Sequence, residues 1–227
     1  ISTVPTANER PRLKIWQLLA LLIAFQLPSF AMATEQVPYE VTEVLDEDME
    51  LRRYGPVLIA ETEIEAGSFS EASDIGFRRL AGYIFGDNAA QQEIAMTAPV
   101  LMESSMAMGS QSGEGSWRMA FAMPSEWTMD SLPRPNNEKV QLVTLPEREV
   151  AAVRFAGRGS PEQFSAAEKR LRAALEKRDL KAGRVSTARY NAPWVPPFLR
   201  RNEVLIDLET AGAESSITSA QVSARAE

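Results

Sequence analysis

The chain has 227 residues, of which 44% are apolar and 24% charged, and it contains neither cysteine nor histidine. This length and composition are typical of a globular domain that buries its own core, and the two missing residue types exclude disulfides, thiolate nucleophiles, a Ser-His-Asp triad and imidazole ligands to a metal. The net charge of −7, without a long basic run, argues against a nucleic-acid partner.

Residues 1–33 are expected to form a secretory signal peptide. Three basic residues at positions 10–14 precede an apolar run from Ile15 to Leu27, and small residues surround Ala33. About 13 apolar residues rise only about 20 Å as a helix, which is short for a hydrocarbon core of about 30 Å. We therefore expect cleavage after Ala33, no stable transmembrane span, and a periplasmic or secreted protein. A permanent membrane anchor is the alternative.

Two amphipathic helices are predicted in the remaining chain. Ser68, followed three residues later by Glu71, indicates a capped helix start, and Gly86 marks the end of that helix. Ser160 with Pro161 at the first helical position indicates the second start. Each helix has one apolar stripe, so each is expected to lie on an apolar surface.

That surface is expected to be a sheet, because eight segments carry period-two or continuous β-rich sequence. The predicted strands are Tyr39 to Leu45, Met49 to Ile64, Ile94 to Met102, Trp117 to Met123, Val140 to Leu145, Val150 to Phe155, Ser186 to Tyr190 and Glu203 to Leu208. Together with the helices, the order along the chain is strand, strand, helix, strand, strand, and this order occurs twice. The repetition predicts an α+β fold of two similar halves. Such halves form a curved sheet or distorted barrel with the helices outside and a groove where they meet. Residues 210–227 lack an apolar period and are expected to be a disordered tail, so the domain spans 34–209.

Several motifs, in order along the domain, resemble those of the SOUL heme-binding proteins. They are Gly76-Phe77-x-x-Leu80-x-x-Tyr83-Ile84-x-Gly86-x-Asn88, Ile94-x-Met96-Thr97-Ala98-Pro99-Val100, Pro133-x-Pro135, Phe155-x-Gly157, Tyr190-Asn191-x-Pro193 and Arg200-Arg201-Asn202-Glu203-Val204. The resemblance covers about residues 37–208. It implies a distorted eight-stranded antiparallel β-barrel flanked by two α-helices, and non-covalent binding of heme or another porphyrin in an apolar groove.

The resemblance places the first helix and the loop before the last strand beside the ligand. A porphyrin needs a flat apolar slot for its face and cations for its two propionates. The residues of these two segments that offer such groups are Phe77, Arg78, Arg79, Tyr83, Tyr190, Trp194, Phe198, Arg200 and Arg201. The alternative is that the aromatic and aliphatic residues of the helix are core and that its arginines are merely solvated.

The absence of histidine means that bound iron has no strong protein ligand or uses Met96, Tyr83 or Tyr190. Weak ligation favours carriage, buffering or scavenging of a tetrapyrrole over redox catalysis. Two alternatives remain open: an enzyme acting on a tetrapyrrole or another small hydrophobic substrate, and a scaffold that binds a protein without any small molecule. No catalytic residue and no metal site is assigned, the protein is expected to be a monomer, and no protein partner is identified.

Two further patterns have a chemical and a structural interpretation. Seven of the nine methionines lie between Met96 and Met129, and this cluster could bind Cu(I) or could simply pack. Glu61, Glu63 and Glu65 share one face of a predicted strand, which is expected to be solvated. If that face instead pointed into the fold, its carboxylates could bind a cationic amphiphile.

Overall fold

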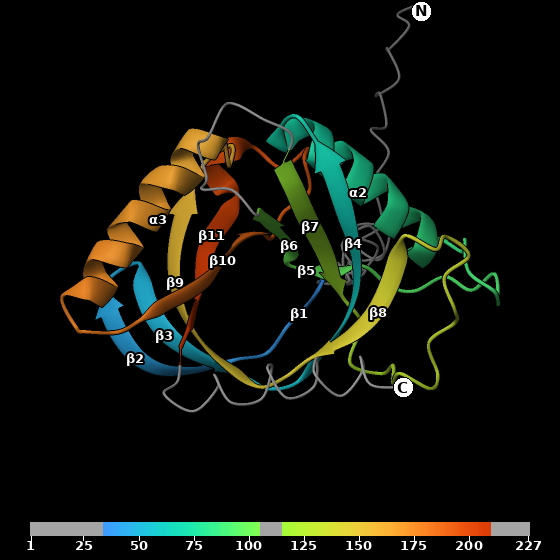
Figure 1. Cartoon of the computed structure of the whole chain (residues 1–227), viewed down its shortest axis with the longest axis horizontal. Helices are drawn as coiled ribbons and strands as arrows, with labels where there is room; N and C mark the ends of the chain where they lie inside the picture. Colours follow the sequence, from blue (N-terminus) through green and yellow to red (C-terminus); the bar gives the residue numbers. More distant parts are fainter. Residues whose placement is uncertain (1–33, 105–114, 210–227) are drawn as a thin grey trace, which may run out of the picture. The chain divides into compact units, whose positions relative to one another are not determined.

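The computed structural model describes residues 34–104 and 115–209, which form an α+β fold (Figure 1). Both the expected signal peptide and the expected tail lie outside the described residues. The helices are α2 (Phe69–Ile84) and α3 (Pro161–Glu176), with a short 3-10 helix η1 (Pro197–Leu199). The strands are β1 (Glu35–Gln36), β2 (Glu40–Asp46), β3 (Met49–Tyr54), β4 (Val57–Ala66), β5 (Thr97–Ala98), β6 (Val100–Ser104), β7 (Gly115–Ala122), β8 (Val140–Leu145), β9 (Arg148–Ala156), β10 (Ala182–Arg189) and β11 (Arg201–Leu208).

Both helices begin where their capping residues predict. The Ser68 hydroxyl accepts a hydrogen bond from the Glu71 backbone N–H at 3.2 Å, and the Glu71 carboxylate accepts one from Gly67 N–H at 3.1 Å. In α3 the box is reciprocal, because Ser160 Oγ accepts from Gln163 N–H and Gln163 Oε1 accepts from Ser160 N–H. These bonds satisfy backbone donors that have no partner within the helix.

The main sheet has nine strands where eight were predicted. Its order is β2-β3-β9-β11-β10-β6-β7-β4-β8, and every recorded pair in it is antiparallel. The extra strand arises because the single strand predicted from Met49 to Ile64 was wrong. The chain breaks at Gly55-Pro56, where proline has no N–H for a ladder, and β3 and β4 then enter distant parts of the sheet.

The sheet does not close into the expected barrel. Within the described residues, β2 and β8 stand at its two ends and no pairing joins them, so the sheet is not closed. β6 and β10 pair at its centre. Outward from that pair, β7, β4 and β8 follow on one side, and β11, β9 and β3 on the other.

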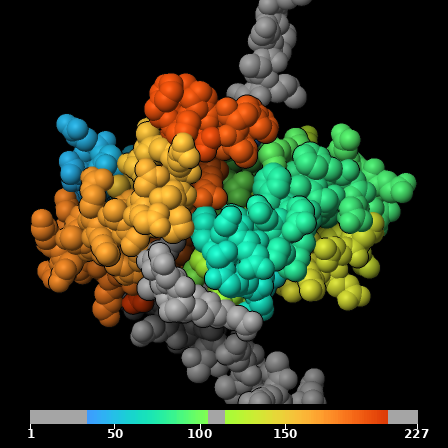
Figure 2. All heavy atoms as spheres, turned by 90° about the horizontal axis from the view of Figure 1, so that it is seen from above, coloured from blue at the N-terminus to red at the C-terminus, as the bar shows by residue number. Residues whose placement is uncertain are grey.

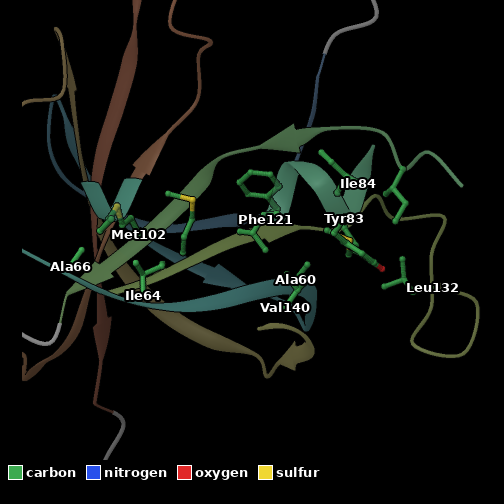
Figure 3. Packing of buried hydrophobic residues seen from close by; sticks show 14 residues of the cluster. Ala60, Ile64, Ala66, Tyr83, Ile84, Met102, Phe121, Leu132 and Val140 are labelled. Atoms are coloured by element: carbon green, nitrogen blue, oxygen red, sulfur yellow. The ribbon is translucent and has the colours of Figure 1, made fainter. Parts of the chain in front are cut away.

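Each helix covers one side of the curved sheet. α2 packs on β4 and β7, whereas α3 packs on β9 and β11, and both helices lie outside the curve (Figure 1). The core under α2 contains Leu80, Met119 and Phe121, and part of it is seen in Figure 3. The core under α3 contains Phe164 and Leu171. Leu80 of α2 and Phe164 and Leu171 of α3 belong to the apolar stripes predicted for the two helices.

The other face of the sheet carries apolar residues together with charges. Along β11, Val204 and Ile206 belong to the α3 core, so by strand alternation Glu203 and Leu205 lie on the opposite face. A third cluster there includes Leu205 and Tyr54, and no helix residue belongs to it. Charged side chains on this face therefore need partners within the sheet.

Candidate ligand-binding groove

The surface is hollowed between α2 and the segment that joins β10 to β11. Figure 2 shows this hollow between the red-orange residues of the β10–β11 segment and the teal and green residues of α2 and the segment after it. Phe77 of α2 is 41% exposed, and Trp194 and Phe198 of the β10–β11 segment are 85% and 76% exposed. Three predicted aromatic residues are thus exposed, one on α2 and two on the β10–β11 segment.

The α2 side of the groove is held firmly. The Phe77 ring lies edge-on to the ring of Phe121, with 5.6 Å between the ring centroids and 61° between their planes. Phe121 is buried in the α2 core on β7. This contact fixes the orientation of Phe77 while leaving part of its ring open to solvent, as a flat ligand requires.

The loop side is braced by its own backbone. Arg200 Nε donates to the carbonyl oxygen of Val195 at 2.7 Å, and Arg200 Nη2 donates to the carbonyl oxygen of Pro193. Gly157 N–H donates to Pro197 O at 3.1 Å, which ties the loop to the end of β9. Arg200 therefore shapes the loop that presents Trp194, and its recorded hydrogen bonds go to neutral carbonyls.

Arg189, which the sequence analysis did not select, connects the elements around the groove. Its guanidinium donates to Gly159 O at 2.7 Å and to Ser73 Oγ of α2 at 3.3 Å. It also lies 4.7 Å from the ring centroid of Phe69 and 5.5 Å from that of Phe164. Arg189 thus joins α2, β10 and the loop before α3.

Like Arg79 and Arg200, Arg189 is a part-buried arginine with no recorded carboxylate partner among the described residues. Its Nε is buried and has no hydrogen-bond partner among residues 34–104 and 115–209. Burial lowers the pKa of Arg189, and the nearby positive charge of Arg200 lowers it further. Carboxylates pair with the buried or part-buried arginines at 52, 148 and 201. No ion pair of Arg189 is recorded among the described residues, and its guanidinium is held by Gly159, Ser73 and the rings of Phe69 and Phe164.

The two predicted arginines of α2 lie elsewhere on that helix. Arg79 Nη1 donates to Thr62 Oγ1 and Glu63 O of β4, at 3.2 and 2.8 Å. Arg78 Nε donates to Asp74 O at 3.2 Å. Both arginines line a shallow depression with Ile75, Gly82 and Asn137. Arg78 and Arg79 therefore lie together on α2. Among the described residues, no hydrogen bond or ion pair joins either of them to the β10–β11 loop.

Tyr83 and Tyr190 have separate environments. Tyr83 is buried in the α2 core (Figure 3), its hydroxyl donates to Pro133 O at 3.0 Å, and burial raises its pKa to about 12. The Tyr190 hydroxyl donates to Glu203 Oε2 at 2.7 Å, and the Arg201 guanidinium lies 3.9 Å from the centre of its ring. Met96, the third candidate iron ligand, is 37% exposed.

Arg201 belongs to the charged face of the sheet. Its Nε donates to Glu203 Oε1 at 2.8 Å, and its other nitrogens reach Gln36 and Tyr39 at 3.3 Å. Because Glu203 lies on the face opposite α3, Arg201 is separated from Arg200 although the two are adjacent in sequence. It is therefore a partner of Glu203 and not of the groove.

The acidic residues also lie on that opposite face. Thr62 bonds to α2, so by alternation Glu61 points to the other face, where Arg118 lies 3.9 Å from Glu61 and 3.5 Å from Glu63. Burial raises the pKa of Glu61 despite the Arg118 charge. No group of three or more acidic residues that could hold a metal ion occurs in the described chain. Neither of its helices is long and apolar enough to cross a bilayer.

Comparison with known proteins places these features in a sequence family. The model of a family described as "SOUL heme-binding protein" matches residues 34–207. Human heme-binding protein 2 is 32% identical over 163 residues, which cover 68% of this chain and 75% of that protein. The mouse protein of the same name is 31% identical with the same coverage.

Solved structures with low sequence identity share the fold. The EcmrR C-terminal domain superposes with a TM-score of 0.55 at 11% identity, covering 76% of this chain and 98% of that one. A hydrolase from Listeria innocua gives a TM-score of 0.50 at 10% identity, covering 72% and 93%. At such identities the likeness concerns the arrangement of strands and helices alone.

Proposed function

This chain belongs to the SOUL heme-binding protein family, and on that premise we propose that it binds heme or a related tetrapyrrole non-covalently in the groove between α2 and the β10–β11 loop. The observation that carries the choice of groove is Arg189, a part-buried cation that has no recorded carboxylate partner, bonds to Ser73 of α2 and packs against Phe69 and Phe164. A porphyrin combines a flat apolar face with two propionates. Phe77, Trp194 and Phe198 would contact the face, and Arg189 would hold a propionate.

The same geometry accounts for binding without a strong bond to iron. The chain contains no histidine, and the hydroxyls of Tyr83 and Tyr190 are already donated to Pro133 and Glu203. Affinity would then come from apolar contact and from the propionate ion pair, so metal-free and zinc protoporphyrin should bind about as well as the iron form.

The direct test is a titration of the purified full chain with hemin, followed by the Soret band. We expect saturable binding, at least about tenfold weaker in Arg189→Gln because an ion pair to a part-buried anion is lost. Arg170→Gln serves as the matched control, because Arg170 is an exposed arginine of α3 paired with Asp48. An unchanged spectrum at micromolar hemin would remove the ligand assignment.

Esterified propionates separate charge from shape. Protoporphyrin dimethyl ester keeps the macrocycle but loses both carboxylates, so it should bind wild type and Arg189→Gln equally. If the ester discriminated between the two proteins as strongly as hemin does, Arg189 would act through the shape of the groove and its role as propionate partner would be disproved.

We also propose that the physiological role is carriage, buffering or scavenging of the tetrapyrrole outside the cytoplasm. The apolar run before Ala33 supports export, and the open groove with weak iron ligation supports reversible loading. The test is cell fractionation with mass spectrometry of the native protein. A mature chain that begins at Thr34 and carries a tetrapyrrole is expected, whereas an uncleaved chain in the cytoplasmic fraction would contradict export.

The order of strands supports a duplicated architecture as part of this proposal. From the central β6/β10 pair, β7, β4 and β8 on one side correspond to β11, β9 and β3 on the other. α2 then covers β4 and β7 as α3 covers β9 and β11. The groove would lie at the junction of two repeats, where Phe69 of one helix approaches Phe164 of the other at 6.2 Å between ring centroids.

A further inference from the structure

The two ends of the nine-stranded sheet are protected to different degrees. β2, at one end, has three acidic residues among its seven, and Arg178 donates to the Leu45 carbonyl oxygen of this strand at 3.4 Å. Charges on an edge strand keep a sheet from pairing with another chain. β8, at the other end (Figure 1), has the sequence Val-Gln-Leu-Val-Thr-Leu and carries no charged residue. The outer side of β8, which we call the β8 edge, therefore lacks the protection that β2 has.

The backbone of β8 has hydrogen-bonding groups that its neighbours do not use. Among residues 34–104 and 115–209, β8 pairs with β4 alone, and its other recorded backbone bond is local, from Val140 N–H to Asn137 O at 2.9 Å. A strand directs its N–H and C=O groups to its two sides in alternation, so those on the outer side of β8 have no recorded partner in this part of the chain. Gln141 and Thr144 are exposed, which leaves room for another strand to approach.

The opposite end of the sheet shows what an edge in this position accepts. Counted outward from the central β6/β10 pair, β8 is the third strand on its side, as β3 is on the other. β3 does not end the sheet, because β2 pairs antiparallel along its outer side. No strand of the described chain occupies the corresponding place beside β8. One more antiparallel strand beside β8 would make the two ends equivalent.

The charges that flank β8 favour a second copy of the same strand. Lys139 precedes β8 and Glu147 follows it, both are exposed, and no ion pair of either is recorded within the part of the chain that the structure describes. Two copies of β8 related by a two-fold axis run antiparallel, and the register centred on Val143 sets Lys139 of each copy near Glu147 of the other. The two neighbouring registers would instead oppose Glu138 to Glu147 or Lys139 to Arg148, and like charges destabilise such pairs.

We propose that the β8 edge is a self-association surface, at which two copies of this chain pair β8 with β8 about a two-fold axis at Val143 and join their sheets into one. The backbone hydrogen bonds hold the strands together, the uncharged sequence permits their approach, and the two Lys139–Glu147 pairs fix the register. This inference goes beyond the proposed function, because none of the residues assigned to the groove belongs to β8. The monomer expected from the sequence is the competing outcome.

The first test is sedimentation velocity of the full chain over a range of concentrations. We expect a reversible equilibrium between monomer and dimer. Lys139→Glu should weaken the dimer about tenfold, because two attractive pairs become repulsive, and the double variant Lys139→Glu/Glu147→Lys should bind within about twofold of wild type. Lys169→Glu is the matched control, because it makes the same change of charge at an exposed lysine of α3 and should leave the dimer unchanged.

Cysteine cross-linking tests the register, since the chain has no cysteine of its own. Val143→Cys places a thiol opposite its own copy, at the separation of roughly 4.5–5.5 Å between Cβ atoms of paired residues, and copper phenanthroline should oxidise the two thiols to a disulfide. Val44→Cys on β2, at a position 69% exposed, carries the same thiol at the other end of the sheet and should cross-link much more slowly. Thr144→Lys adds a charge at an exposed position of β8 and should abolish the dimer without unfolding the chain.

Specific results would overturn the proposal. They are a wild-type chain that stays monomeric at every concentration, including the case in which β8 binds a strand of another protein, a dimer that persists in Thr144→Lys, a double charge variant that does not recover, or equal cross-linking at positions 143 and 44. Hemin titration of Thr144→Lys gives an independent readout. Unchanged hemin binding is expected, so failure at the β8 edge would leave the heme proposal standing, and the reverse also holds.

Discussion

Arg52 and Glu203 form a bidentate ion pair in the interior of the sheet, with Arg52 Nη1 2.7 Å and Nη2 3.0 Å from the two carboxylate oxygens. The side chains are 1% and 0% exposed, although they are 151 residues apart in sequence. Arg201, Arg154 and the Tyr190 hydroxyl also contact Glu203, and Arg52 also bonds to Glu50 and to the Tyr54 hydroxyl. This network links β3 to β11 across β9.

Replacing Glu203 by Gln should therefore destabilise the fold strongly. The amide keeps the shape but removes the fully buried counter-charge of Arg52, which is left with the part-buried Glu50 at 2.6 Å, and this costs about 3 kcal/mol in unfolding free energy. Urea unfolding measures this loss. Glu149→Gln is the control, because Glu149 pairs with Arg53 at 3.4 Å with both side chains over 40% exposed, and it should cost less than about 1 kcal/mol. Equal losses in the two variants would refute the buried pair as a main contribution.

Stability should also fall in acid because of Glu203. Burial alone would raise the pKa of this carboxyl, but Arg52, Tyr190 and Arg201 hold its pKa below the usual value near 4.5. A group with a lowered folded-state pKa contributes stability that is complete above the unfolded value and is lost as the pH falls through the folded one. The unfolding free energy should thus decline below about pH 4.5, and Glu203→Gln should flatten that decline. Parallel curves for the two proteins would contradict the assignment.

Two glycines of α2 should respond in opposite ways to alanine. A Cβ at Gly76 would lie 3.0 Å from Met119 Cβ and 3.1 Å from Ile64 Cδ1, so Gly76→Ala should overpack the core and cost about 1–3 kcal/mol. At Gly82 the nearest atom is Asp87 Cβ at 3.9 Å, so Gly82→Ala should stabilise the helix by about 0.5–1 kcal/mol. Thermal unfolding of both variants checks the pair. A stabilising Gly76→Ala would mean that α2 does not approach β7 this closely.

The aromatic residues of the β10–β11 loop should affect binding and not folding. Trp194 and Phe198 are largely exposed, so replacing both by Ala should change the unfolding free energy by less than about 0.5 kcal/mol. Hemin affinity should fall about fivefold or more because a flat apolar contact is removed. Val44→Ala on β2 removes an equally exposed apolar residue, at 69%, far along the chain and should alter neither quantity. Unchanged hemin affinity in the double variant would place the ligand elsewhere.

Part of this architecture was predictable because its causes are local. Ser68 and Ser160 mark the helix starts because a capping hydroxyl bonds to the backbone three residues later, which needs no distant partner. The apolar stripe of α3 correctly predicted its buried face, and that of α2 did so at Leu80, Ala81 and Ile84 but not at Phe77, which is 41% exposed. The family resemblance was likewise carried by short motifs along the chain and is confirmed over residues 34–207.

The pairing of the strands and the face to which each arginine side chain points could not be predicted from local sequence. Met49 to Ile64 is almost continuously β-rich, and only the tertiary structure shows that Gly55-Pro56 sends β3 and β4 to distant places in the sheet. Arg200 and Arg201 are neighbours in sequence, yet one braces the loop and the other pairs with Glu203. Alternation along a strand puts adjacent side chains on opposite faces, but only the pairing of strands decides what each face meets.

The sequence by itself thus determined the helices, the family and the residue types that a ligand could use, since composition, capping and periodicity are properties of the chain. The tertiary structure alone decided that Arg189 lies between Phe69 and Phe164 without a recorded carboxylate partner, and that β8 stands at one end of the sheet. Whether a charge is paired depends on which residues distant in sequence the fold brings within a few ångströms, and no local pattern encodes that distance.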